Sequence, residues 1–299
     1  MARLWSLLVL AVLIGGVLTF AIGPTYRMSL PQDVSTHGHT IDGLYYFILA
    51  LTGIVFIATQ SVLFYFMWRY EANTNKDPIT YTHGSHTLEI VWTIIPAATL
   101  LFISIFQFDS WAEAKMRNPM YGPDGKPGTA DDMPPTLEVT ARQWEWRLRY
   151  PGQDGRLGTA DDLFTVNELH VPVNQDIVVS LKSMDILHSF FLPELRVKQD
   201  AVPGMKIPVW FQATKTGRYE LVCAEHCGAR HYAMKGMLVV DTPEDYQAWL
   251  RKLTREQFRT QPATTQTNAT ADNATSNNAT SNNAPADSTQ LTSANQGEL

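Results

Sequence analysis

Three long runs of apolar residues stand in the first third of the chain. They extend over residues 4–26, 43–68 and 90–108, and none of them contains a charged side chain. A helix needs roughly 20 apolar residues to cross the hydrocarbon core of a bilayer. The second and third runs therefore predict a transmembrane helical hairpin within residues 43–110, and with it a multi-pass membrane protein.

The first apolar run admits two interpretations. Arg3 precedes it, and the small residues Ala21 and Gly23 lie at its end, as in a signal peptide with its cleavage site. Its apolar stretch is long for a signal peptide and also suits a retained transmembrane helix. Residues 1–26 are therefore expected to be either a signal peptide or an extra helix.

Basic residues near the apolar runs are few but unevenly distributed. Arg3 precedes the first run, and Arg69 and Lys76 lie between the second and the third. The positive-inside rule places these residues on the cytoplasmic side. We therefore expect the chain after residue 108 to lie on the periplasmic, outer side of the cell (inner) membrane.

The pattern changes to a period of two residues from position 136 onward. Leu137, Val139 and Ala141 alternate with polar neighbours, and Trp144 and Trp146 continue the alternation. Further strand-like stretches follow at 164–171, 176–181, 207–212, 218–223 and 237–240. Because clusters of Gly, Pro, Asn and Asp separate these short stretches, the pattern predicts an antiparallel all-β sandwich or barrel over residues 134–258.

One helix is predicted to close this domain. Thr242 suits the N-cap position with Asp245 three residues later, and Tyr246, Trp249 and Leu250 form an apolar stripe at helical spacing.

The last forty residues are of another kind. Residues 260–299 contain no aromatic residue and no Val, Ile or Met. Such a segment cannot bury enough apolar surface to offset its chain entropy. A disordered low-complexity tail is therefore expected over residues 260–299.

Charge and cysteine content exclude two classes of protein. The chain carries 23 basic and 29 acidic residues, a net charge of −6, so we expect no binding of nucleic acid, which requires a basic surface. Two cysteines are too few for a disulfide scaffold.

Six potential metal ligands lie within twelve residues near the end of the β domain. They are Cys223, Glu225, His226, Cys227, His231 and Met234. Thiolate, imidazole and thioether together suit copper, two cysteines with a histidine suit structural zinc, and an exported cysteine pair suits a disulfide. The spacing by itself leaves these three interpretations open.

His188 changes the balance between them. A single histidine in an apolar, strand-like stretch is usually a satisfied core residue, but beside a loop rich in ligands it becomes a candidate ligand. One histidine from a strand, with Cys, His and Met from a later loop, is the arrangement of a cupredoxin copper site. Two cysteines in place of one suggest two bridging thiolates and two copper ions.

The ordered motifs of the chain resemble those of one family. Besides residues 187–195 and 223–234, they include Gln-Trp-Glu-Trp at 143–146, Lys-Gln-Asp-Ala-Val-Pro-Gly at 198–204 and Glu-Ile-Val-Trp-Thr-Ile-Ile-Pro at 89–96. From about residue 43 to residue 253 the chain resembles subunit II of the haem–copper cytochrome c oxidases. The resemblance implies a helical hairpin with a periplasmic cupredoxin domain that holds a dinuclear copper centre, copper A.

The resemblance also implies an activity and partners. Electrons would pass from cytochrome c to the copper centre and then to haem in subunit I of a proton-pumping terminal oxidase, an oxidoreductase and translocase that reduces O₂ to water. The expected partners are the haem-bearing subunit I, other oxidase subunits, cytochrome c and the lipid membrane.

The family's ligands fall on matching positions of this chain. Cys223 and Cys227 match the bridging thiolates, and His188 and His231 match the terminal imidazoles. Met234 matches the axial thioether of one copper ion.

Three further roles are carried over from the resemblance. Glu225 matches the residue whose backbone carbonyl is a weak copper ligand and whose carboxylate binds magnesium at the interface with subunit I. Trp144 matches the aromatic residue through which electrons arrive, and Glu89 matches the start of a proton path into subunit I. His226 departs from the family pattern, because an apolar residue is common at that position.

Other functions compete with this one. A quinol oxidase subunit of the same fold would lack the copper ligands, which are complete here. A protein similar to nitrous oxide reductase would share the dinuclear centre but carries a large propeller domain and lacks the hairpin. A protein with a structural disulfide is the remaining alternative.

A repeat flanks the stretch at 137–150. Residues 124–132 recur as 154–162 in the frame Asp-Gly-x-x-Gly-Thr-Ala-Asp-Asp. The carboxylates are candidate calcium ligands, although the spacing is not that of an EF-hand, and a pair of solvated turns is the alternative. They are Asp124, Asp131 and Asp132 in the first copy and Asp154, Asp161 and Asp162 in the second. A straight strand over 137–150 would separate the copies by roughly 45 Å, so we expect separate sites unless a bulge folds the strand back.

Overall fold

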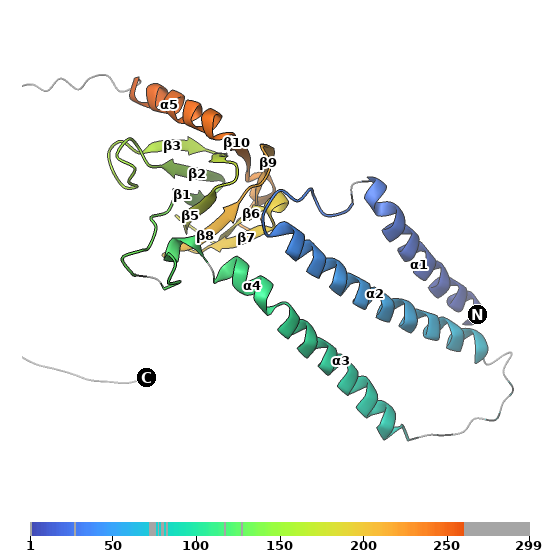
Figure 1. Ribbon diagram of the computed structural model, residues 1–299. Helices are drawn as coiled ribbons and strands as arrows, with labels where there is room; N and C mark the ends of the chain where they lie inside the picture. The colour runs from blue at the N-terminus through green and yellow to red at the C-terminus, as the bar shows by residue number, and fades with distance from the viewer. Residues whose placement is uncertain are drawn as a thin grey trace, which may run out of the picture. The chain divides into compact units, whose positions relative to one another are not determined.

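The structure is a computed structural model that describes residues 2–26, 28–71, 76, 78, 81, 83–116, 118–126 and 128–259 (Figure 1). The expected tail at 260–299 lies outside these residues. Both copies of the Asp-Gly repeat, at 124–132 and 154–162, lie within these residues except for position 127.

The apolar runs form long helices. They are α1 (Ala2–Ile22), followed by the short 3-10 helix η1 (Gly23–Tyr26), α2 (Gly38–Arg69) and α3 (His86–Phe106), followed by α4 (Phe108–Lys115). Among the described residues, three stretches are long and apolar enough to cross a membrane: Arg3–Tyr26, Gly38–Arg69 and His86–Lys115. The hairpin predicted from the second and third runs is confirmed, with an additional helix before it.

In the part of the chain that the structure describes, ten strands form two five-stranded sheets. One sheet has the order β3-β2-β1-β5-β8 and the other β4-β10-β9-β6-β7. The strands are β1 (Leu137–Arg142), β2 (Glu145–Tyr150), β3 (Leu163–Val166), β4 (Glu168–Pro172), β5 (Asp176–Ser183), β6 (His188–Leu192), β7 (Val197–Ala201), β8 (Ile207–Gln212), β9 (Gly217–Cys223) and β10 (Lys235–Asp241). The inward-facing residues of both sheets form one hydrophobic core, so the all-β sandwich is confirmed.

The sheets are mixed, however, and not purely antiparallel. Strand β1 pairs with β5 in parallel, and β10 pairs with β4 in parallel. The sequence pattern is blind to this, because the alternation along a strand is the same for either direction of its neighbour.

The expectation of one straight strand over 137–150 is wrong. β1 and β2 form an antiparallel hairpin in which Ala141 lies opposite Trp146 and Glu138 opposite Arg149. The buried positions are odd-numbered in β1, as at Ala141, and even-numbered in β2, as at Trp146. This change marks the break between the two strands, because one continuous strand would keep the same alternation throughout. The chain reverses at 143–144, so the roughly 45 Å separation of the two Asp-Gly repeats does not apply.

Two further strands differ from the sequence pattern. The stretch at 164–171 is divided into β3 and β4 at Asn167, whose φ of 59° interrupts the extended backbone. Strand β7 has no alternating pattern because it is rich in polar residues and lies at the edge of its sheet.

The last helix, α5 (Pro243–Arg259), begins as expected. The Thr242 hydroxyl accepts a hydrogen bond from the Asp245 backbone N–H at 3.2 Å. Tyr246 is buried, and Trp249 stacks on the ring of His170 with centroids 4.1 Å apart. The apolar stripe therefore packs on the sandwich.

Candidate metal centre

The thiol cluster lies where three segments of the second sheet meet. Cys223 ends β9, His188 begins β6, and Met234 directly precedes β10. The backbone N–H of Cys223 donates to the Met234 carbonyl at 3.1 Å, and that of Ala224 donates to the Ser189 carbonyl at 3.1 Å. The first bond joins the two ends of the loop and the second attaches the loop to β6, so the sheet positions the ligands.

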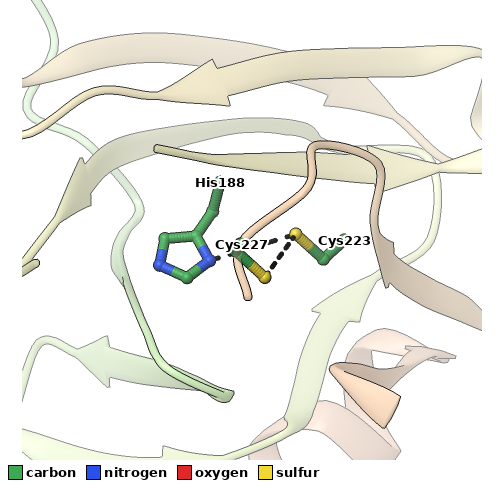
Figure 2. Close-up of side chains that lie close together, drawn as sticks. All are labelled: His188, Cys223 and Cys227. Carbon is green, nitrogen blue, oxygen red and sulfur yellow. Dashed lines mark hydrogen bonds between the residues drawn. The ribbon is translucent and has the colours of Figure 1, made fainter. Parts of the chain in front are cut away.

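Three of the predicted ligands converge closely. The ligand atoms of His188, Cys223 and Cys227 all lie within 4.8 Å of one another, and all three residues are buried. Figure 2 shows the two sulfurs side by side, with the His188 ring turned toward them. The Cys223 and Cys227 sulfurs are 3.7 Å apart, well beyond a disulfide bond of about 2.05 Å, and both cysteines are free.

The remaining ligands complete two groups of donors. His188 Nδ1 lies 4.0 Å from Cys223 Sγ, and the Glu225 carbonyl oxygen lies 3.3 Å from the same sulfur. His231 Nδ1 lies 3.6 Å and Met234 Sδ 3.8 Å from Cys227 Sγ. Each sulfur therefore has one imidazole and one weaker donor beside it.

Electrostatics differ between the two thiols. Burial alone would raise the pKa of Cys223, but hydrogen bonds with His188 and with backbone groups lower it to about 6. Burial and the neighbouring Cys223 sulfur raise the pKa of Cys227 to about 12. The Cys223 thiol therefore ionises more readily than the Cys227 thiol.

Asp185 orients His188, a role that the sequence pattern did not predict. Its carboxylate lies 2.8 Å from His188 Nε2 and accepts a hydrogen bond from the Gln143 backbone N–H at 2.7 Å. Burial lowers the pKa of His188, but the Cys223 thiol and the Asp185 carboxylate outweigh it, so the net shift is upward. The only indication of this role in the sequence is the position of Asp185, three residues before His188.

Two side chains brace the loop from the β1–β2 turn. Gln143 Nε2 and Trp144 Nε1 both donate to the Cys227 carbonyl, at 2.9 Å and 3.0 Å. The half-buried Trp144 is thus joined to a candidate ligand residue by one hydrogen bond. Gln143 was missed as a site residue, since its partner lies 84 positions away in the sequence.

The contacts of Glu89 are with its own helix and not with the thiol cluster. It is in the first turn of α3, where Glu89 Oε2 is 3.4 Å from His86 Nδ1. The Ser85 hydroxyl caps this helix by accepting from the Leu88 backbone N–H at 3.4 Å.

The two Asp-Gly repeats fold into similar turns. In each turn a threonine hydroxyl donates to an aspartate, Thr129 to Asp131 and Thr159 to Asp161, both at 2.7 Å. These hydroxyls are the main cause that lowers the pKa of Asp131 and of Asp161. The turns therefore satisfy much of their carboxylate charge internally.

Comparison with known proteins identifies the family. The family model for the periplasmic domain of cytochrome c oxidase subunit II matches residues 136–242, and the model for its transmembrane domain matches residues 23–109. Cytochrome c oxidase subunit 2 of Cereibacter sphaeroides is 32% identical over 266 residues, which cover 78% of this chain and 82% of that protein. The chain belongs to the cytochrome c oxidase subunit II family.

Other relatives carry the same description. Cytochrome c oxidase subunit 2 of Thermostichus vulcanus is 28% identical over 295 residues, which cover 84% of this chain and 85% of that protein. The crystal structure of the periplasmic domain of subunit II of cytochrome oxidase from Bradyrhizobium japonicum is 29% identical, with a TM-score of 0.37. It covers 43% of this chain and 99% of that one.

Membership of the subunit II family sets the context of the site. The chain is a membrane-bound subunit of a multi-subunit haem–copper oxidase, and its cupredoxin-like domain is periplasmic. The donor set fits copper, because two thiols, two imidazoles and a thioether are the soft and borderline ligands that copper prefers, and they converge here without a disulfide.

Proposed function

We propose that this subunit receives electrons from cytochrome c at a dinuclear copper A centre and passes them to haem in subunit I of a proton-pumping oxidase. The observation that carries the proposal is the pairing of donors around two sulfurs 3.7 Å apart. Copper ions bound there supply one-electron redox chemistry. Residues 43–110 are then the membrane hairpin, residues 134–258 are the copper A domain, and residues 1–26 are a signal peptide or an extra helix.

Two sulfurs with symmetric surroundings suit two metal ions better than one. The proposed bridging ligands are Cys223 and Cys227, with His188 on the side of the first sulfur and His231 on the side of the second. The Glu225 carbonyl and the Met234 thioether are the corresponding weak ligands. A single blue-copper ion needs only one cysteine, so the second thiol is explained by a second ion.

The surrounding residues hold this donor set in place. With copper bound, His188 would donate from Nε2 to Asp185, and Nδ1, on the side of Cys223, would be the nitrogen that holds the metal. Gln143 and Trp144 fix the Cys227 carbonyl. A rigid frame of this kind limits the movement of the ligands when an electron arrives, and therefore suits electron transfer.

Further roles follow from the resemblance to the family. We assign Trp144 to electron arrival, because its indole is half-buried and contacts the Cys227 carbonyl directly. Glu89 is assigned to proton uptake, and the Glu225 carboxylate to magnesium at the subunit I interface. For the Asp-Gly repeats we favour solvated turns over calcium sites, since Thr129 and Thr159 already bind the carboxylates.

A matched pair of histidine variants tests the copper assignment. His188 and His170 are both buried in the sandwich beside a carboxylate, at 2.8 Å from Asp185 and 2.7 Å from Asp241, but only His188 faces a thiol. In the purified oxidase, His188→Gln should lower the copper content and abolish the delocalised electron-spin signal of the centre. His170→Gln should leave both unchanged.

The same measurement can contradict the proposal. One copper ion per wild-type subunit II domain would exclude a dinuclear centre. Retention of the full signal in Cys223→Ser or Cys227→Ser would exclude bridging thiolates, because a serine hydroxyl is neither soft nor ionised at neutral pH.

A further inference from the structure

The candidate ligands differ in their access to solvent. Cys227 and His188 are 0% exposed, Met234 is 1% and Cys223 is 8% exposed, whereas the His231 side chain is half-buried. The buried sulfurs are therefore shielded, and the ring of His231 is the imidazole ligand that solvent reaches. A metal ion that approaches from solution meets His231 before it meets Cys227.

An additional imidazole lies at this accessible position. His226 is exposed, and its ring centroid is 5.6 Å from that of His231, with the ring planes at 65°. Among the described residues, the ring contact with His231 is the single interaction of the His226 side chain. Nothing in the structure of the sandwich requires an imidazole there.

The separation of the two rings suits a shared metal ion. With metal–nitrogen bonds of about 2 Å, two imidazoles on one ion have ring centroids about 5–6 Å apart. Nδ1 of His231 lies 3.6 Å from the Cys227 sulfur. The second ring nitrogen of His231, Nε2, points in a different direction from Nδ1 because of the geometry of the ring. The ring of His231 can therefore meet an ion on its outer side as well as on its inner side.

We propose that His226 and His231 form an outer copper-loading site, which captures a copper(I) ion and passes it to Cys227. The proposal rests on the dinuclear copper function proposed above. In the transfer, the bonds from copper to the His226 nitrogen and to the outer nitrogen of His231 break, and bonds from copper to the Cys227 sulfur and to His231 Nδ1 form. The His231 ring proton moves from Nδ1 to the outer nitrogen through water. The Cys227 thiol proton is released to solvent, and the oxidation state of copper does not change.

The rate of copper uptake tests this role separately from electron transfer. The full chain in detergent, with reduced cysteines and without oxygen, is mixed with the copper(I)–bicinchoninate complex in excess over two copper ions per chain, and the absorbance of the complex falls as copper leaves it. His226→Leu should take up copper about ten-fold more slowly, the order of effect known for residues that support metal ligands. The final copper content should equal that of the wild type.

A matched variant and a second chain background provide controls. His39→Leu removes another exposed imidazole, at the start of α2, and should load at the wild-type rate. In a chain with Cys223→Ser and Cys227→Ser, the outer pair should still bind one copper(I) ion weakly, and His226→Leu should abolish that binding.

The outcomes are distinct. Equal loading rates in the wild type and in His226→Leu would overturn the loading site while leaving the dinuclear centre intact. Failure of the wild-type chain to retain two copper ions against the chelator would instead overturn the proposed function.

Discussion

Gly228 is the position where backbone conformation, packing and the metal loop meet. Its φ is +108°, in the left-handed region, and it directly follows Cys227. A Cβ added there would lie 3.0 Å from Gln143 Nε2 and 3.3 Å from Trp144 Cζ2. Gly228→Ala should therefore displace both side chains that donate to the Cys227 carbonyl.

The expected cost has two parts. Left-handed backbone strain at a residue with a Cβ costs about 1–2 kcal/mol. Loss or weakening of the two hydrogen bonds to the Cys227 carbonyl adds about 0.5–1 kcal/mol each. The free energy of unfolding of the cupredoxin-like domain should thus fall by about 2–4 kcal/mol in total.

Gly158→Ala separates these two parts. Gly158 has a similar φ of +98°, but its added Cβ would meet nothing within 4 Å. This variant carries the backbone strain without the collision, so its comparison with Gly228→Ala isolates the loop contacts. A difference of about 1–2 kcal/mol corresponds to a melting temperature lower by roughly 3–10 °C for a domain of this size.

Thermal unfolding and copper release of the full chain in detergent provide the assay. Gly228→Ala should melt below Gly158→Ala and lose copper faster to a chelator, because the segment that carries Cys227 is no longer held. Equal melting temperatures and equal release rates in the two variants would refute the inference that Gln143 and Trp144 brace the metal loop.

Four further predictions follow from the site. Trp144→Phe loses the N–H donor to Cys227 and should oxidise cytochrome c much more slowly, with the copper spectrum retained. A rate equal to that of a Trp210→Phe control would remove Trp144 from the site. Added salt should slow the wild-type reaction, because the chain is acidic. Glu89→Gln should slow turnover but not reduction by cytochrome c, whereas full turnover would indicate only a carboxylate at a helix start. Copper(I) uptake should release more protons at about pH 5 than at about pH 8, because thiols must ionise to bind. Cys223, with a pKa of about 6, is already ionised at the higher pH, whereas Cys227 is not. Proton release that does not depend on pH would contradict these pKa values. Millimolar calcium should produce neither heat on titration nor a higher melting temperature, and two bound ions per chain would instead establish the Asp-Gly turns as calcium sites.

Local sequence determined the parts of this protein whose physics is local. The length of an apolar run is enough to predict a membrane-spanning helix, since the bilayer sets one thickness for all of them. The candidate ligands from Cys223 to Met234 lie within one loop, so their types and spacing mark a candidate metal site before any fold is known, although the spacing alone also suits a disulfide. The Thr242 cap and the stripe on α5 are likewise properties of neighbouring residues.

The tertiary structure decided what depends on distant residues. The bonds from Gln143 and Trp144 to the Cys227 carbonyl join positions more than eighty residues apart. The pairing of each sulfur with its own imidazole, and the parallel pairing of β1 with β5, depend in the same way on how the sheets assemble. Alternation along a strand records which face is buried but not which strand lies beside it. For that reason the sequence predicted the candidate ligands but not the residues that hold them in place.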